Sequence, residues 1–63
     1  MKIKQLSTGE RVAIFALSEA DDSEVVQVRA WLEERFPLEY QMDNLHITIT
    51  KEAGFMFALR WLG

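Results

Sequence analysis

Apolar and polar positions along the chain predict a short series of strands and one helix. Residues 11–17 form an apolar run rich in β-branched and aromatic side chains, which is typical of a strand. Residues 45–50 alternate strictly between apolar and polar, which predicts a half-buried strand at a sheet edge. Residues 2–6 fit either a short edge strand or a loose arm, and the sequence leaves both open.

The helix has the clearest signals, and we expect it from Asp21 to about residue 36. Asp21 is a natural N-cap, and Glu24 three residues later completes a capping box. Pro37 disfavours helical geometry in the residue before it, so the helix should end there. At 100° per residue the apolar positions gather into one stripe: Val25, Val28, Leu32 and Phe36.

The last segment, residues 55–62, is apolar on both sides when it is read as a strand. Such a pattern is typical of a strand in the middle of a sheet that is covered on both faces. Residues 51–54 then predict a hairpin turn, with Gly54 at a position of positive φ. One predicted face carries Phe55, Phe57, Leu59 and Trp61, and the other carries Met56, Ala58, Arg60 and Leu62.

These elements predict one small α+β domain over residues 1–63, with the order β-α-β-β of half a ferredoxin-like unit. A right-handed crossover would make the strands before and after the helix parallel. The last strand would lie between them, giving the spatial order first, last, middle, with antiparallel neighbours. One helix would cover one face, and residues 2–6 could add an edge strand.

A single helix leaves the second sheet face uncovered, and this predicts an interface. Exposed apolar patches of a few hundred Å² usually mark interaction sites. A second copy of the chain would cover such a face, so we expect a homodimer; alternatively, residues 2–6 and 38–44 fold over it. The expected interface residues are Phe15, His46, Thr48, Met56, Ala58, Arg60 and Leu62.

Charge is distributed unevenly and points to a second surface. The formal net charge is −3, and eight of the ten acidic residues lie between positions 19 and 43. The helix surface should therefore be acidic and suited to binding a protein partner, with electrostatic complementarity accelerating the encounter. The expected partner-binding residues are Glu24, Gln27, Trp31, Glu33 and Glu34. Small acidic proteins of this kind include phage and mobile-element products that inhibit or adapt host proteins.

Candidate catalytic and metal-binding groups are few. The chain has no cysteine and one histidine, His46, so a zinc site would depend on one imidazole and carboxylates. The acidic residues at 19–24 lack the glycine and distal glutamate of a calcium loop, and capping explains them better. The three glycines are dispersed, which excludes a phosphate-binding loop. We expect a protein without enzymatic activity and without cofactors.

A nucleic-acid-associated regulator is the alternative function. Lys2, Lys4, Arg11 and Arg60 would contact phosphate, and aromatic side chains on the open sheet face would stack on bases. Most aromatic residues fall on the presumed helix side, and net negative charge disfavours phosphate binding. No apolar run is long enough to span a membrane, and no signal-peptide stretch follows the first residues, so we expect a cytoplasmic protein.

Overall fold

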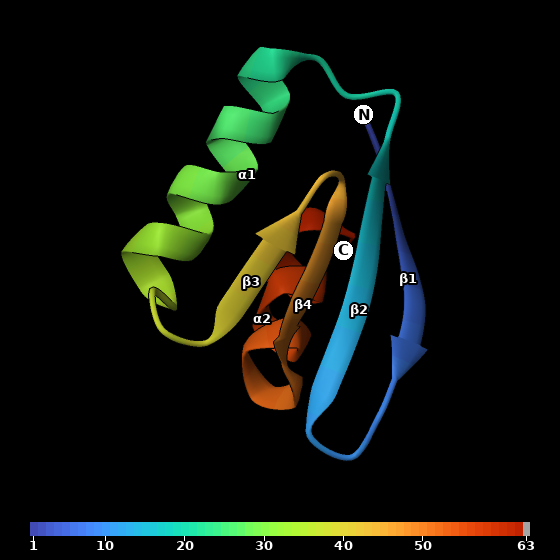
Figure 1. Cartoon of the computed structure of the whole chain (residues 1–63), viewed down its shortest axis with the longest axis vertical. Coiled ribbons are helices and arrows are strands. Elements are labelled where there is room, and N and C mark those ends of the chain that lie inside the picture. The colour runs from blue at the N-terminus through green and yellow to red at the C-terminus, as the bar shows by residue number, and fades with distance from the viewer. Residues whose placement is uncertain (63) are drawn as a thin grey trace.

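Six elements follow one another along the chain in the order ββαββα. The computed structural model describes residues 1–62. The four strands form one sheet in the order β1-β2-β4-β3, and every pair of neighbours is antiparallel (Figure 1). The elements are β1 (Lys2–Thr8), β2 (Val12–Ser18), α1 (Asp22–Arg35), β3 (Tyr40–Asp43), β4 (His46–Thr50) and α2 (Lys51–Trp61).

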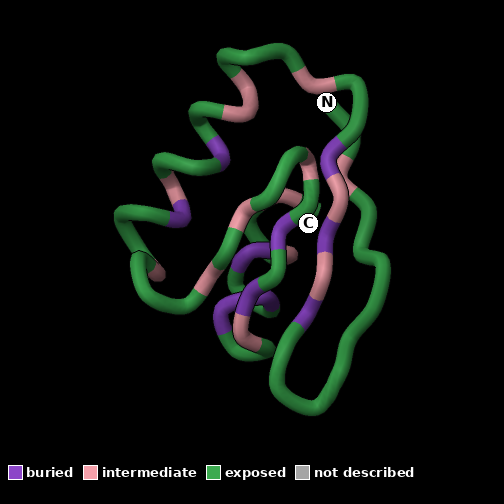
Figure 2. Tube along the Cα trace, viewed as in Figure 1, coloured by how far each residue is buried: buried purple, intermediate pink, exposed green. Residues whose placement is uncertain are grey.

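Both helices pack against the same face of the sheet. In Figure 1, α2 lies behind the strands, and aromatic contacts join α1 to α2 on that side. The residues of the two central strands on this face are buried, as the purple segments of β2 and β4 in Figure 2 show. They form one cluster with buried residues of both helices. The buried core consists of Ala13, Phe15, Leu17, Val28, Leu32, Ile47, Ile49, Ala53 and Phe57.

Helix α1 confirms the prediction made for residues 21–36. The Asp21 carboxylate accepts a hydrogen bond from the backbone N–H of Glu24 at 2.8 Å, and the Glu24 carboxylate accepts one from the N–H of Asp21 at 3.1 Å. These two bonds form the capping box, and such a cap is worth about 1 kcal/mol. Val28 and Leu32 point into the core, and the helix ends at Arg35, one residue before the Phe36 C-cap.

The prediction for residues 51–62 was wrong: the segment forms helix α2 instead of a turn and a central strand. Thr50, the last residue of β4, is the N-cap, and its hydroxyl accepts a hydrogen bond from the N–H of Ala53. Ala53 and Phe57 are buried, and Trp61, the next residue at this helical spacing, is half-buried. As a helix, the segment buries only one of its sides. The strand interpretation required both of its sides to be buried.

The α+β class and the antiparallel neighbours are confirmed, whereas the half-ferredoxin order is wrong. Residues 2–6 belong to β1, and residues 38–44, to which the sequence assigned no strand, contain β3. The extra hairpin reverses the chain before β4, so β4 is antiparallel to β2 instead of parallel to it. As a result β2 and β4 occupy the centre, and β4 is not an edge strand.

The two edge strands of the sheet, β1 and β3, differ in length and regularity. β3 has only four residues, whereas β1 has seven and contains an irregularity between Gln5 and Ser7. A bulge and charged side chains on an edge strand both oppose pairing with another chain. Lys2 and Lys4 supply such charges on β1.

Within residues 1–62, neither helix has the length and apolar character needed to cross a membrane.

Candidate protein-binding surface

Of the nine exposed large apolar residues among those described, four lie on the outward side of α2 or at its C-cap. We define the outer α2 face as Phe55, Met56, Leu59 and Leu62. Their exposed fractions are 65%, 49%, 56% and 45%, respectively. Phe55 and Leu59 are one helical turn apart, with Met56 and Leu62 beside them, so the four side chains form a continuous stripe.

An aromatic cluster between the helices holds this face in place. The ring of Phe57 lies 4.9 Å from that of Phe15 on the sheet and 6.0 Å from that of Trp31 on α1. Trp61 packs edge-on against Trp31 at 6.5 Å. These distances are within the favourable range for aromatic pairs. The inward side of α2 is therefore fixed on both the sheet and α1.

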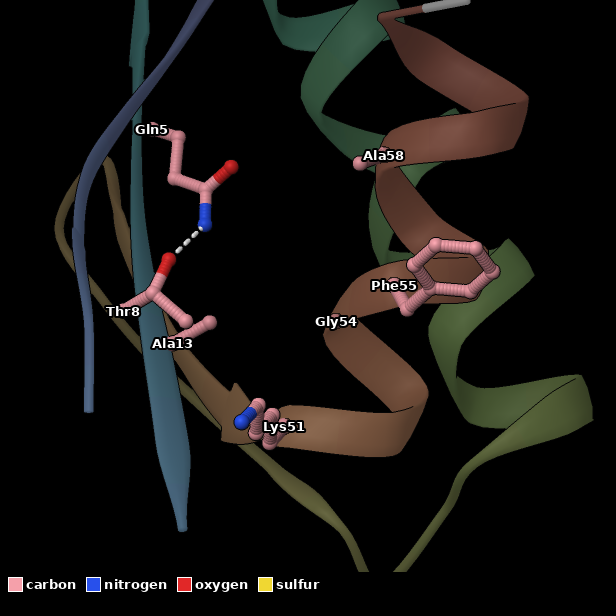
Figure 3. Close-up of a pocket in the computed structure, with 7 residues that line it drawn as sticks. All are labelled: Gln5, Thr8, Ala13, Lys51, Gly54, Phe55 and Ala58. Atoms are coloured by element: carbon pink, nitrogen blue, oxygen red, sulfur yellow. Dashed lines mark hydrogen bonds between the residues drawn. The ribbon is translucent and has the colours of Figure 1, made fainter. Parts of the chain in front are cut away.

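A hollow lies on each side of α2. Between α2 and β1 the hollow has a volume of about 260 Å³, and Figure 3 shows Gln5 and Thr8 on its strand side facing Gly54 and Ala58. Between α2 and α1 the hollow has a volume of about 320 Å³. This second hollow is lined by Trp31, Arg35, Phe36, Met56, Leu59 and Arg60.

Charged side chains surround the outer α2 face. The Arg60 guanidinium lies 4.4 Å from the centre of the Trp61 ring, and the Arg35 guanidinium lies 5.4 Å from that of Trp31. At the other end of the helix, Lys51 and Glu52 are exposed in the first turn. An apolar centre with a charged rim is the usual anatomy of a protein–protein interface.

The predicted interface residues do not share one surface. Phe15 is fully buried in the core, whereas His46 and Thr48 lie on the sheet face opposite to the helices. Of the other four, Met56, Ala58 and Arg60 belong to α2 and Leu62 is its C-cap, because this segment forms a helix behind the sheet. Among them Ala58 is half-buried and lines the hollow beside β1.

The open sheet face, the side of the sheet away from the helices, is more polar than the sequence predicted. Its apolar members are Ile14 and Ala16, which are half-buried, and Val12, which is 41% exposed. No residue of α1 or α2 contributes to it, because both helices pack against the other face through the core and the aromatic contacts. The strand register places on it Lys2, Lys4, Ser7, Val12, Ile14, Ala16, Ser18, Gln41, Asp43, His46, Thr48 and Thr50.

Several of the predicted partner-binding residues on α1 already have intramolecular contacts. The Glu24 carboxylate takes part in the capping box and lies 3.3 Å from the N-terminal amino group. The Glu33 carboxylate accepts a hydrogen bond from the Tyr40 hydroxyl at 2.5 Å. Trp31 is half-buried in the aromatic cluster, and only Gln27 and Glu34 are exposed without such a contact among the bonds found in residues 1–62.

Tyr40 on β3 has a perturbed titration. Burial of the phenol raises the pKa of Tyr40, and the hydrogen bond to Glu33 and the negative charge of Glu33 raise it further. The positive charge of Arg29 opposes this shift. Tyr40 lies on β3 and Glu33 on α1, so this contact joins the edge strand to the helix above it.

The structure offers few groups for chemistry. Within residues 1–62 no three His, Cys, Asp or Glu side chains are grouped closely enough to hold a metal ion. His46 is exposed on the open sheet face and pairs in register with Asp43 on β3.

Sequence reasoning missed Phe55 and Leu59 as surface residues because strand spacing assigned them to the helix-covered face. The available signal was composition: residues 51–62 contain no valine, isoleucine or threonine. Strands are enriched in these β-branched residues, whereas phenylalanine, methionine, leucine and alanine are compatible with a helix.

Comparison with known proteins gives no match: no protein-family model, no curated protein and no solved structure is significantly similar to this chain.

Proposed function

We propose that this protein is a small, non-catalytic protein-interaction module that binds another polypeptide through the outer α2 face. One observation carries the proposal: four large apolar side chains on one side of one helix are each about half exposed. Taking about 200 Å² for a large apolar residue, they expose roughly 400 Å² to water. Contiguous patches of this size on small proteins are often functional.

The rigidity of α2 supports binding through this face. Its inward residues Phe57 and Ala53 are buried, and Trp61 packs against Trp31. The outward residues are therefore presented on a fixed backbone, and less conformational freedom is lost when a partner binds. This distinguishes the outer α2 face from isolated exposed apolar residues such as Leu38, which lies in the connection after α1.

The acidic surface of α1 and the open sheet face are weaker candidates. Glu24 and Glu33 already accept hydrogen bonds within the chain. No phenylalanine, tyrosine or tryptophan of residues 1–62 lies on the open sheet face, so the aromatic platform typical of sheet-based RNA binders is reduced there to His46. Lys2 on that face forms an ion pair with Glu19 at 2.9 Å.

Site-specific photo-crosslinking tests the proposal. The photoreactive residue benzoylphenylalanine replaces Phe55, and in a control protein it replaces Val26, which is 64% exposed on the opposite side of α1 from its buried residues. After illumination in cells that produce the protein, we expect a discrete protein adduct from position 55 and none from position 26. The mass of the adduct identifies the partner as a second copy or as a different chain.

The proposal fails if position 55 gives no discrete adduct, or if both positions give the same adducts at the same yield. The first result would mean that the outer α2 face stays in contact with water. The second would mean that the protein is captured non-specifically by its neighbours.

A further inference from the structure

We propose that the polypeptide on the outer α2 face is a second copy of this chain, with the two α2 helices packed antiparallel about a two-fold axis. The inference rests on the proposed function and specifies its partner. The two-fold axis would pass near Phe57, so that Phe55 of each copy meets Leu59 of the other. A symmetric contact of this kind uses one surface twice, as most homodimers do.

The charges at the two ends of α2 favour this arrangement. Glu52 is in the first turn and Arg60 is in the last turn. Eight residues separate them, which is roughly 12 Å along the helix. In an antiparallel pair centred near Phe57, Glu52 of one helix comes within about one helical turn of Arg60 of the other. The two-fold symmetry generates two such charge pairs. A parallel pair would instead place equal charges together.

The helix ends and the hollows agree with the same orientation. Antiparallel helices bring the positive end of one dipole beside the negative end of the other. The hollow of about 320 Å³ beside Met56 and Leu59 has partly apolar walls. An apolar cavity of about 150 Å³ holds a benzene ring, so this space suffices for the ring of a second Phe55.

The area is sufficient for a weak but specific dimer. The outer α2 face contributes roughly 400 Å², and partial burial of its charged rim raises this to about 600 Å² per chain, the lower end of the range for specific interfaces. The other surfaces are less suited to self-association. β1 carries a bulge and two lysines, and the open sheet face is mostly polar.

Sedimentation equilibrium on four proteins tests the inference: the wild type, Glu52→Arg, Arg60→Glu and the double variant Glu52→Arg/Arg60→Glu. We expect the wild type to dimerise with a dissociation constant in the micromolar range. Each single variant places equal charges together, so its dissociation constant should rise about tenfold. The double variant restores opposite charges and should return to within about threefold of the wild type.

Leu59→Glu and Val26→Glu complete the experiment. A charge at Leu59 lies in the centre of the proposed contact and should raise the dissociation constant at least a hundredfold. The same charge at Val26, which is also exposed, should leave it unchanged. Circular dichroism checks that each variant keeps the helical content of the wild type.

Three results would overturn the inference: a wild-type monomer at all concentrations, a dimer that Leu59→Glu leaves intact, or single charge variants that dimerise as well as the wild type. A monomer whose benzoylphenylalanine at position 55 crosslinks to a different protein would overturn the inference and leave the proposed function standing. A monomer without any adduct would contradict both.

Discussion

Gly54 shows at the scale of one residue how closely α2 approaches the sheet. A Cβ atom at this position would lie 3.0 Å from the Cβ of Ala13 and 3.2 Å from Cγ2 of Ile49. Both distances are shorter than ordinary contacts between carbon atoms. Gly54 is therefore a packing residue, and it does not have the positive φ that the sequence analysis expected of a turn.

We predict that Gly54→Ala destabilises the protein although alanine is the better helix former. Alanine gains about 1 kcal/mol in helix propensity, whereas overpacking a core contact costs about 1–3 kcal/mol. Urea unfolding should therefore show a net loss of about 1 kcal/mol.

Gly9→Ala is the matched control for this prediction. A Cβ at Gly9 would lie 3.4 Å from the carbonyl oxygen of Val12, which is an ordinary contact. We expect a change within about 0.5 kcal/mol, as for most surface substitutions. A Gly54→Ala variant more stable than the wild type would show that α2 does not sit as close to β2 and β4 as described.

Local signals predicted α1 better than any other element. The capping box of Asp21 and Glu24, the apolar stripe and Pro37 each depend on residues only a few positions apart, so the sequence alone contains them. No turn residues separate α2 from the strand before it, because β4 ends at Thr50 and α2 begins at Lys51. An apolar run directly after a strand then resembles the second strand of a hairpin.

Strand β3 was missed for a different reason. It has four residues, of which Tyr40 and Met42 face the helices and are only half-buried. Alternation of apolar and polar residues over so short a stretch is a weak signal. The strand is stabilised by its pairing with β4, and such tertiary contacts cannot be read from the local sequence.

The contact between β3 and α1 predicts a dependence of stability on alkaline pH. The pKa of Tyr40 is raised in the folded state, mainly by burial and then by Glu33. The folded state thus holds the phenol proton more tightly than the unfolded state, whose tyrosine pKa is about 10. This contribution to stability is complete below the unfolded pKa and is lost as pH rises through the folded one.

We expect the unfolding midpoint of the wild type to fall more steeply above pH 10 than that of Tyr40→Phe. Tyr40 is the only tyrosine, so the ultraviolet absorbance of phenolate reports its titration without interference from another tyrosine. Equal pH slopes for the two proteins would mean that the pKa of Tyr40 is not raised in the folded state, and hence that Tyr40 is neither buried nor bonded to Glu33 as described.

The whole molecule has one core, on one side of one sheet. Both helices cover the same face, and the opposite face meets water with a largely polar set of side chains. The sequence predicted an open apolar surface on the second face of the sheet, whereas that face is mostly polar and four of the exposed large apolar residues lie on or next to α2. It assigned this surface to the sheet because a segment apolar at every position fits both strand and helix periods. The structure assigns it to the outward side of α2.

Residue-resolved NMR on dilution tests the central claim that a second copy occupies the outer α2 face. On going from millimolar to micromolar protein, the amide signals of Phe55, Met56 and Leu59 should shift, while those of His46 and Thr48 on the open sheet face stay unchanged. Carbon chemical shifts from the same spectra report whether residues 51–61 are helical. Shifts confined to the open sheet face, or spectra independent of concentration, would contradict the account.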